Sequence, residues 1–284
     1  MKEDNDNLEK EMKKEKRDTN QNKNEELKGN KFLIYLCNFM DPINTPLSFG
    51  PKFIKFNWII NTQKTGTIII MSLLMYYYQN YSKGAWLYLS LHGTYGLLWF
   101  LKDMVFPDKS FQQKLAIFPS FLVSLFLLSY WLMGFQVMIG IGDQSPSGKK
   151  IFGCFFLFSI GNILMICTDL QKFIQLKYKK GLIDDLFLAN NRNTNYFGEI
   201  LVYLTFAIAC GRKEGYIMLI IEWIFFFGSR IYMKDLRLAR KHGFEKYKQN
   251  SYIILFKFFK SHFLNMIVYS LIILGIYAFI YLFY

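Results

Sequence analysis

A stripe of polar and aromatic residues lies within an otherwise apolar stretch of the chain. His92, Tyr95, Trp99 and Lys102 are spaced by three, four and three residues, and Asp103 follows directly. Side chains at this spacing share one face of an α-helix. Because polar groups are costly at membrane depth and usually mark a function there, the stripe predicts a water-accessible cavity inside a helical bundle. The alternative is a histidine–tyrosine hydrogen bond that only holds two helices together.

A second stripe contains Asn162, Asp169 and Lys172, at intervals of seven and three residues. It continues past the predicted end of its membrane span through Asp169-Leu-Gln171-Lys172. This pattern predicts polar groups that face the same cavity from another helix. The alternative is an ordinary polar helix end at the membrane interface.

Two acidic residues fall within predicted spans and therefore need partners. Glu199 lies about one turn inside its span, and Arg192 or another basic loop residue is its candidate partner. Glu222 lies deepest, with Arg230 eight residues further on and on roughly the same helical face. A carboxylate in the bilayer must be paired or protonated, so both positions predict local polar networks.

The elements that carry these residues follow from composition. Hydrophobic residues make up 52% of the 284 residues and charged residues only 19%, and apolar runs long enough to cross a bilayer recur along the sequence. Backbone groups in lipid must be satisfied within the segment, which requires helices here. The sequence predicts an all-α, multi-pass transmembrane bundle of about seven helices. The predicted spans are 65–81, 85–102, 116–141, 151–168, 197–210, 214–233 and 264–284.

The chain divides into four predicted segments. Residues 1–30 are rich in charge and poor in apolar side chains, which is typical of a disordered tail. Residues 31–60 contain several prolines and glycines and predict an interfacial or re-entrant approach to the membrane. Residues 61–262 form the predicted membrane domain, and residues 263–284 add a C-terminal transmembrane helix.

The distribution of basic residues predicts an orientation. With the N-terminus on the cytosolic or inner side, the inner loops 102–114, 169–196 and 230–263 carry 17 Lys and Arg residues, against five in the outer loops. A basic inner face attracts anionic lipid head groups, and it equally suits a cofactor with several phosphates. The sequence contains no Cys/His spacing typical of a metal site and no glycine-rich dinucleotide fingerprint, and it predicts no nucleic-acid partner.

Taken together, these residues resemble the steroid 5α-reductase-like membrane proteins, over about residues 60–257. The most specific block resembles the family's Arg-(His/Asn)-Pro-Asn-Tyr-(Phe/Leu)-Gly-Glu signature. The isoprenylcysteine methyltransferases share this C-terminal architecture. The matching blocks are Leu91-His92-Gly-Thr-Tyr95-Gly-Leu-Leu-Trp99-Phe-Leu-Lys102-Asp103 with Phe106-Pro107, Asp169-Leu-Gln171-Lys172, Arg192-Asn193-Thr194-Asn195-Tyr196-Phe197-Gly198-Glu199, and Gly243-Phe244-Glu245-Lys246-Tyr247-Lys248 with Ser251-Tyr252.

The resemblance implies a pocket for NADPH on the inner side and hydride transfer to an activated C=C bond of an apolar lipid that enters from the bilayer. It implies that His92 or Tyr95 polarises the substrate carbonyl or supplies the proton. An endoplasmic reticulum or other organelle membrane is expected from the same resemblance. The implied cofactor-binding residues are Asp169, Gln171, Lys172, Arg192, Asn195, Tyr196, Glu199, Arg230, Tyr247 and Tyr252.

The sequence departs from the family pattern in one loop. Thr194 replaces the signature proline, Asn190 stands where an aromatic residue is expected, and Leu186 stands where glycine is common. Loss of the fixed proline φ predicts a looser loop. This loop, the extra final span and the tail suggest an alternative function, a non-catalytic structural subunit of a larger membrane complex. The resemblance to the isoprenylcysteine methyltransferases leaves another alternative, a methyltransferase that uses S-adenosylmethionine.

Overall fold

A computed structural model describes residues 29–178 and 181–283 of the chain. Nearly all of the predicted tail, residues 1–30, lies outside the described residues. The described part of the chain is all-helical, with 71% of the described residues in helices, which confirms the predicted fold class at that level. The described β structure is one antiparallel ribbon of two short strands, β1 and β2.

The elements follow one another as a series of helices with short connections. A helix lies at each of the predicted spans, although several boundaries differ from those predicted. The elements are α2 (Lys31–Met40), β1 (Ile54–Lys55), α3 (Phe56–Tyr77), α4 (Lys83–Val105), β2 (Lys114–Leu115), α5 (Ile117–Ser129), α6 (Trp131–Met138), α7 (Gly148–Tyr178), η1 (Leu186–Leu188), α8 (Thr194–Cys210), α9 (Lys213–Glu222), the π-helical η2 (Trp223–Phe227), α10 (Gly228–Leu238), α11 (Phe244–Asn250) and α12 (His262–Phe283).

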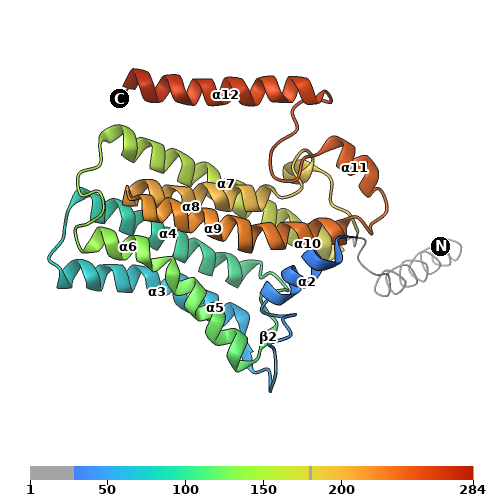
Figure 1. Cartoon of the computed structure of the whole chain (residues 1–284), viewed down its shortest axis with the longest axis horizontal. Coiled ribbons are helices and arrows are strands. Elements are labelled where there is room, and N and C mark those ends of the chain that lie inside the picture. The colour runs from blue at the N-terminus through green and yellow to red at the C-terminus, as the bar shows by residue number, and fades with distance from the viewer. Residues whose placement is uncertain (1–28, 179–180, 284) are drawn as a thin grey trace, which may run out of the picture.

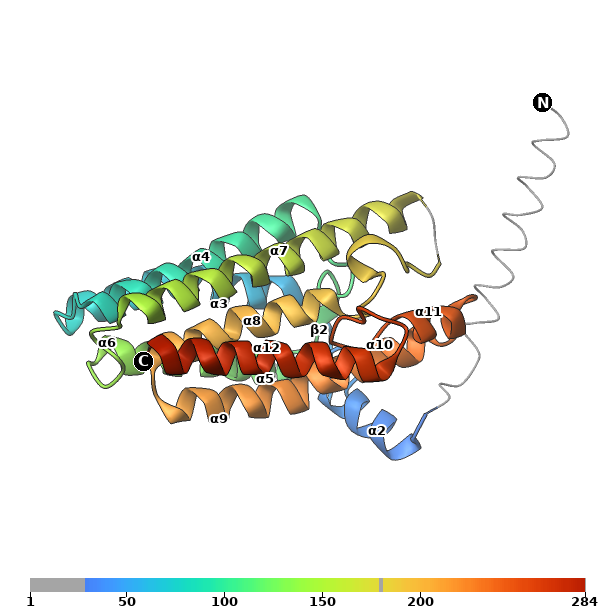
Figure 2. The same cartoon turned by 90° about the horizontal axis from the view of Figure 1, so that it is seen from above.

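Helices α3 to α10 lie side by side with their long axes in roughly the same direction (Figures 1 and 2). One end of this bundle holds the last turns of α4 and α7, the first turn of α8 and all of α10. We call it the basic end, because most of the lysines and arginines of the described chain after α3 lie there. The short helix α2 lies beside α10 at this end, where the hydroxyl of Tyr232 accepts a hydrogen bond from the backbone N–H of Asn30.

Three helical stretches are long and apolar enough to cross a membrane by length and composition: Ile117–Met138, Gly148–Tyr178 and Lys213–Leu238. Their outward faces expose large apolar side chains such as Leu125, Phe155 and Ile224. Apolar surface on this scale is unusual for a protein in water. The chain is therefore membrane-associated.

Glycines bring the central helices into close contact. A Cβ atom at Gly161 of α7 would lie 2.6 Å from the carbonyl oxygen of Gly198 of α8, and one at Gly198 would lie 2.5 Å from that of Gly161. A Cβ at Gly96 of α4 would likewise lie 2.0 Å from the carbonyl oxygen of Lys64 in α3. Small residues allow helix backbones to approach closely in membrane proteins. Gly198, in the block that resembles the family signature, thus has a packing role here.

Two predicted boundaries are wrong for the same reason. Helix α3 begins at Phe56 rather than at residue 65. Helix α7 continues to Tyr178 rather than ending at residue 168. Each predicted boundary lies next to a charged residue, Lys64 or Asp169. In the structure Lys64 is buried and the Asp169 side chain is largely buried, and both have polar partners within the bundle.

The last helix differs from the others in its surroundings. Helix α12 runs along the bundle but stands apart from it in Figure 1. The described side chains along most of it, such as Phe263, Met266 and Leu271, are exposed. Its first turn is held by Asn265, whose side chain accepts from the backbone N–H groups of Phe258 and Phe259.

Candidate functional site

A cavity of about 480 Å³ opens at the basic end, between α3, α4, α5, α7, α8 and α10. Cavities of this size hold drug-sized ligands and cofactors. Part of its wall is apolar and aromatic, with Phe56 and Ile60 of α3, Trp99 of α4, and Val123 and Leu127 of α5. The two predicted polar stripes, on α4 and α7, both reach this cavity, which supports the prediction that they face a common space.

The polar part of the cavity is strongly basic. Eight lysine and arginine residues line it, against three acidic residues. These are Lys64, Lys102, Lys172, Arg192, Arg230, Lys234, Arg237 and Lys241, with Asp108, Asp169 and Glu199. An excess of cations in a partly enclosed space raises the local concentration of anionic ligands.

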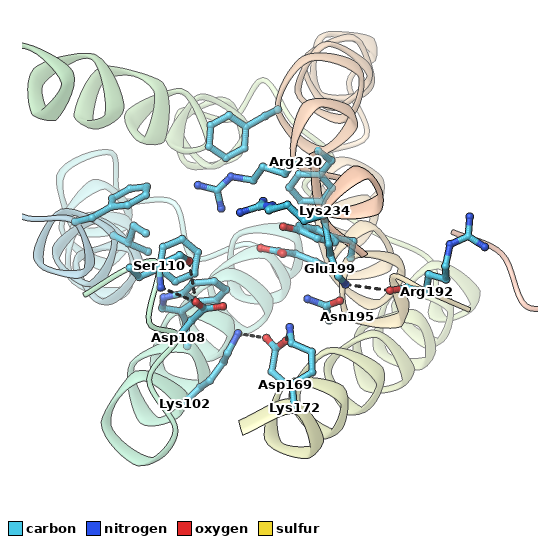
Figure 3. Close-up of a pocket in the computed structure, with 18 of the residues that line it drawn as sticks. Lys102, Asp108, Ser110, Asp169, Lys172, Arg192, Asn195, Glu199, Arg230 and Lys234 are labelled. Atoms are coloured by element: carbon cyan, nitrogen blue, oxygen red, sulfur yellow. Dashed lines mark hydrogen bonds and ion pairs between the residues drawn. The ribbon is translucent and has the colours of Figure 1, made fainter. Parts of the chain in front are cut away.

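Asp169 joins the α4 and α7 walls of the cavity. Its carboxylate forms an ion pair with Lys102 of α4 and another, at 2.7 Å, with Lys172 one turn further along α7 (Figure 3). The two ammonium groups share a single carboxylate, so the cluster keeps a net positive charge. Oxygen atoms of an anionic ligand can complete the coordination of both lysines.

Two cations project into the cavity from α10, as Figure 3 shows. The Arg230 guanidinium lies 4.7 Å from the ring centroid of Phe226 and 5.3 Å from that of Phe111. Among the described residues no carboxylate forms an ion pair with Arg230. The ammonium of Lys234 donates to the backbone carbonyl of Arg192 at 3.0 Å. Both side chains therefore retain donors for a ligand.

Arg192 belongs to the cavity wall, but its guanidinium is engaged by other residues. Its guanidinium points away from the centre of the cavity (Figure 3) and is almost fully buried. It pairs with Asp235, Nε to Oδ1 at 2.6 Å, and donates to the backbone carbonyl of Ser251 at 2.9 Å. The expectation that Arg192 neutralises Glu199 is therefore wrong, because the guanidinium of Arg192 forms its ion pair with Asp235 of α10.

Glu199 instead belongs to a buried network of hydroxyl and ammonium groups. The Tyr95 hydroxyl donates to Oε1 of Glu199 at 2.9 Å. Lys64 donates to the hydroxyls of Tyr95, at 2.8 Å, and Tyr203, at 3.0 Å. Lys64 also lies 4.1 Å from the ring centroid of Trp99. Lys64, Glu199 and Tyr203 line the cavity, and Tyr95 supports them from behind.

The structure does not bring His92 into the cavity. Its Nδ1 lies 3.0 Å from the hydroxyl of Tyr88, one turn earlier in α4, and its ring stacks on Phe206 of α8 at 4.4 Å. The side chain is 2% exposed. The histidine–tyrosine hydrogen bond lies within α4, so it does not hold two helices together as the alternative proposed; the contact between helices is the stacking on Phe206.

The loop that precedes α8 is tightly held, so the prediction of a looser loop is wrong. Residues 191–194 are almost completely buried. The side chains of Asn191 and Asn193 donate to the backbone carbonyls of Ile254 and Ile253, each at 2.8 Å. Thr194 donates through its hydroxyl to the carbonyl of Phe187 at 2.6 Å. These side-chain hydrogen bonds replace the constraint that a proline would impose.

The remaining predicted cofactor residues divide into two groups. Asn195, Tyr196 and Tyr247 line the cavity, and Asn195 Oδ1 is buried with no hydrogen-bond partner. Gln171 and Tyr252 do not line it. Gln171 donates to the backbone and side chain of Asp185, and Tyr252 lies against His262 with its hydroxyl 2.8 Å from Nδ1.

Tyr247 and Lys241 complete the rim outside the spans. The Tyr247 hydroxyl donates to the backbone carbonyl of Leu188 at 2.6 Å, and burial raises the pKa of this phenol well above its usual range. Lys241 donates to the carbonyl of Gly181 at 2.5 Å, and burial lowers the pKa of its ammonium. Desolvation disfavours the charged form of either group.

Glu222, the deepest predicted acid, does not reach Arg230. It is 3% exposed and accepts a hydrogen bond from Ser129 of α5 at 3.4 Å.

Several residues that line the cavity were not predicted from the sequence. They are Lys64, Lys234, Arg237, Lys241, Asp108 and Ser110. The one signal for Lys64 in the sequence is its place as a lysine just before the predicted span 65–81.

No family model matches the chain, and a search of curated proteins finds no match. The class that the fold and site define is an all-helical, membrane-associated protein with a basic ligand cavity.

Proposed function

We propose that this protein is a membrane-embedded reductase that uses NADPH to reduce an activated C=C bond in an apolar lipid. The observation that carries the proposal is one cavity whose wall combines basic side chains with aromatic and aliphatic ones, and which includes Lys64 and Glu199, both hydrogen-bonded to Tyr95. Such a wall can hold a phosphate-rich cofactor together with an apolar substrate. It agrees with the resemblance to the steroid 5α-reductase-like proteins.

The chemistry of the donor set fits NADPH. Lys172, Arg230 and Lys234 offer cationic donors for its phosphates, while the unpartnered Asn195 Oδ1 offers an acceptor for an amide or hydroxyl group. When bound, NADPH supplies the hydride. The basic side chains of the cavity wall would hold it.

Lys64 is the proposed electrophile, in place of His92. The ammonium of Lys64 donates two hydrogen bonds, to the hydroxyls of Tyr95 and Tyr203. Its third N–H is free to donate to a substrate carbonyl in the cavity that Lys64 lines. A cationic donor in a dry site stabilises the enolate charge that develops during reduction. Tyr95 and Glu199 position Lys64, and a proton delivered to the α-carbon completes the reaction.

The membrane arrangement belongs to the same proposal. We infer seven crossings, α3, α4, α5–α6, α7, α8, α9–α10 and α12, with the basic end and the N-terminus on the cytosolic side. Aromatic side chains on outward faces, including Trp58, Trp86 and Tyr76, suit the bilayer interfaces. An endoplasmic reticulum location follows from the family resemblance.

Electrostatics favour NADPH over S-adenosylmethionine. The methyl donor carries a sulfonium cation, an ammonium group and a carboxylate, so it is a net cation, and it has no phosphates. A cavity with eight cationic and three acidic side chains repels such a cofactor. The methyltransferase alternative is therefore disfavoured.

A structural subunit remains the second candidate, because α12 exposes apolar side chains along its described length. Such a helix suits contact with lipid or with another membrane subunit. This candidate predicts a cavity that binds no nucleotide and co-purification with fixed partners.

The deciding experiment measures NADPH binding to the detergent-purified full chain, by quenching of tryptophan fluorescence and by thermal shift. Lys234→Ala should weaken binding about tenfold or more, since a hydrogen bond to a charged group contributes about 1.5–3 kcal/mol. Lys213→Ala is the matched control, because Lys213 is exposed and begins α9, at the opposite end of the continuous helical segment formed by α9, η2 and α10. A folded protein that shows no saturable binding would refute the reductase proposal and favour the structural subunit.

A further inference from the structure

A second cavity, of about 390 Å³, adjoins the first on the side of the bundle between the last turns of α4 and α7. Lys102, Asp108, Asp169 and Lys172 line both cavities. The ion pairs of Asp169 therefore form a partition between them. We call this second space the side cavity. Neither the resemblance nor the proposed reductase mechanism gives it a role.

The side cavity combines a basic rim with an apolar wall. Four lysines line it: Lys102, Lys109, Lys172 and Lys177. Asp169 already binds Lys102 and Lys172. Among the described residues no acidic partner forms an ion pair with Lys109 or Lys177, and both are exposed. The rim therefore carries cationic charge that is not neutralised within the described protein.

The apolar wall distinguishes this space from a simple anion site. Phe106 and Phe173 face each other across the two helices with ring centroids 6.4 Å apart, and Leu176 lies beside them. Both helices also expose large apolar side chains close by, such as Leu101 on α4 and Leu170 on α7. A small hydrated anion would gain nothing from these surfaces. A ligand with a phosphate joined to acyl chains would use both parts.

We propose that the side cavity binds the head group of an anionic phospholipid, with its phosphate between Lys109 and Lys177 and its acyl chains along the outer faces of α4 and α7. Basic pockets between transmembrane helices at the cytoplasmic side bind such head groups. The proposal depends on the membrane placement of the chain and is independent of reductase activity, so the two can fail separately.

Native mass spectrometry of the full chain in detergent, with phosphatidylglycerol or phosphatidylcholine added, tests the proposal. The test variant carries Lys109→Ser and Lys177→Ser, and a charge-matched control carries Lys83→Ser and Lys213→Ser at the opposite end of the bundle. All four lysines are exposed, so the variants should fold, which a thermal melt verifies. We expect the unmodified chain and the control to prefer phosphatidylglycerol at least tenfold, and the test variant to lose that preference.

Three results would overturn the proposal. Equal binding of the two lipids by the unmodified chain would exclude recognition of an anionic head group. An unchanged preference in the test variant would place the lipid elsewhere. Displacement of phosphatidylglycerol by millimolar inorganic phosphate alone would show that the cavity takes a free anion rather than a lipid.

Discussion

The ammonium of Lys64 donates a 2.8 Å hydrogen bond to the hydroxyl of Tyr95, inside a helix pair held together by the close contact at Gly96. The bond links α3 to the polar stripe of α4 and directs Lys64 into the cavity. Lys64 is 4% exposed and lies amid Trp99, Tyr95 and Tyr203. The position of this one cation connects the fold to the proposed chemistry.

Lys64→Met should separate catalysis from cofactor binding. The variant keeps the length of the side chain but removes the donor. Turnover of an enone lipid should fall about 10²–10³-fold, as on loss of an oxyanion-stabilising donor, while NADPH affinity should change little. Steady-state kinetics and binding titrations measure the two effects. Lys55→Met, just before the same helix, is the control, and equal turnover in Lys64→Met and the wild type would contradict the assigned role.

Arg192→Ala should destabilise the protein rather than selectively abolish cofactor binding. Removal of one partner from a buried ion pair costs about 3–5 kcal/mol, and Asp235 and the carbonyl of Ser251 would lose their donor. A lowered midpoint in detergent thermal melts is expected. The double variant Arg192→Leu with Asp235→Leu should be less destabilised than Arg192→Ala. A normal melting midpoint with lost NADPH binding would instead place the guanidinium in the site.

Gly198→Ala should disrupt the contact between α7 and α8. The added Cβ would lie 2.5 Å from the carbonyl oxygen of Gly161, which cannot move without shifting the helix. Overpacking of this kind costs about 1–3 kcal/mol. Gly153→Ala on α7 is the control, because a Cβ there meets nothing within 4 Å. Thermal melts should show a lower midpoint for Gly198→Ala only.

Leu186→Gly should stabilise the protein. Leu186 has a φ of 45°, in the left-handed region, and its side chain is 73% exposed. This conformation costs a residue with a Cβ about 1–2 kcal/mol, which glycine avoids at little loss of packing. Leu186→Ala keeps the Cβ and should give no such gain. An equal effect of both substitutions in chemical or thermal unfolding would show that backbone strain is not responsible.

Lys241 should give the stability of the protein a specific dependence on pH. Burial lowers its folded-state pKa, so the unfolded chain binds more protons between the lowered value and the ordinary one. Stability therefore rises with pH across that window, and the penalty is greatest below it. Lys241→Met should remove this rise. Melting midpoints of both proteins should be compared up to about pH 9.5, below ordinary tyrosine ionisation.

The fold could be predicted from the sequence to the level of helices and their order. Long apolar runs must be helical in lipid, and the polar stripes on α4 and α7 place Trp99, Lys102, Asp169 and Lys172 around one cavity. The ends of α3 and α7 could not be predicted, because a charge normally marks the end of a span. A charged side chain is stable inside the bundle only when a polar group from another helix pairs with it.

The sequence by itself determined the composition of the site: a surplus of Lys and Arg at one end of an apolar chain, with acids and amides at helical spacing. The tertiary structure decided which of these groups face the cavity. Arg192 turns to Asp235, His92 stacks on Phe206, and Lys64 and Lys234 enter from helices distant in the sequence. Periodicity fixes the face of a helix on which a residue lies. Which neighbour that face meets depends on how the helices pack, and that is a property of the whole fold.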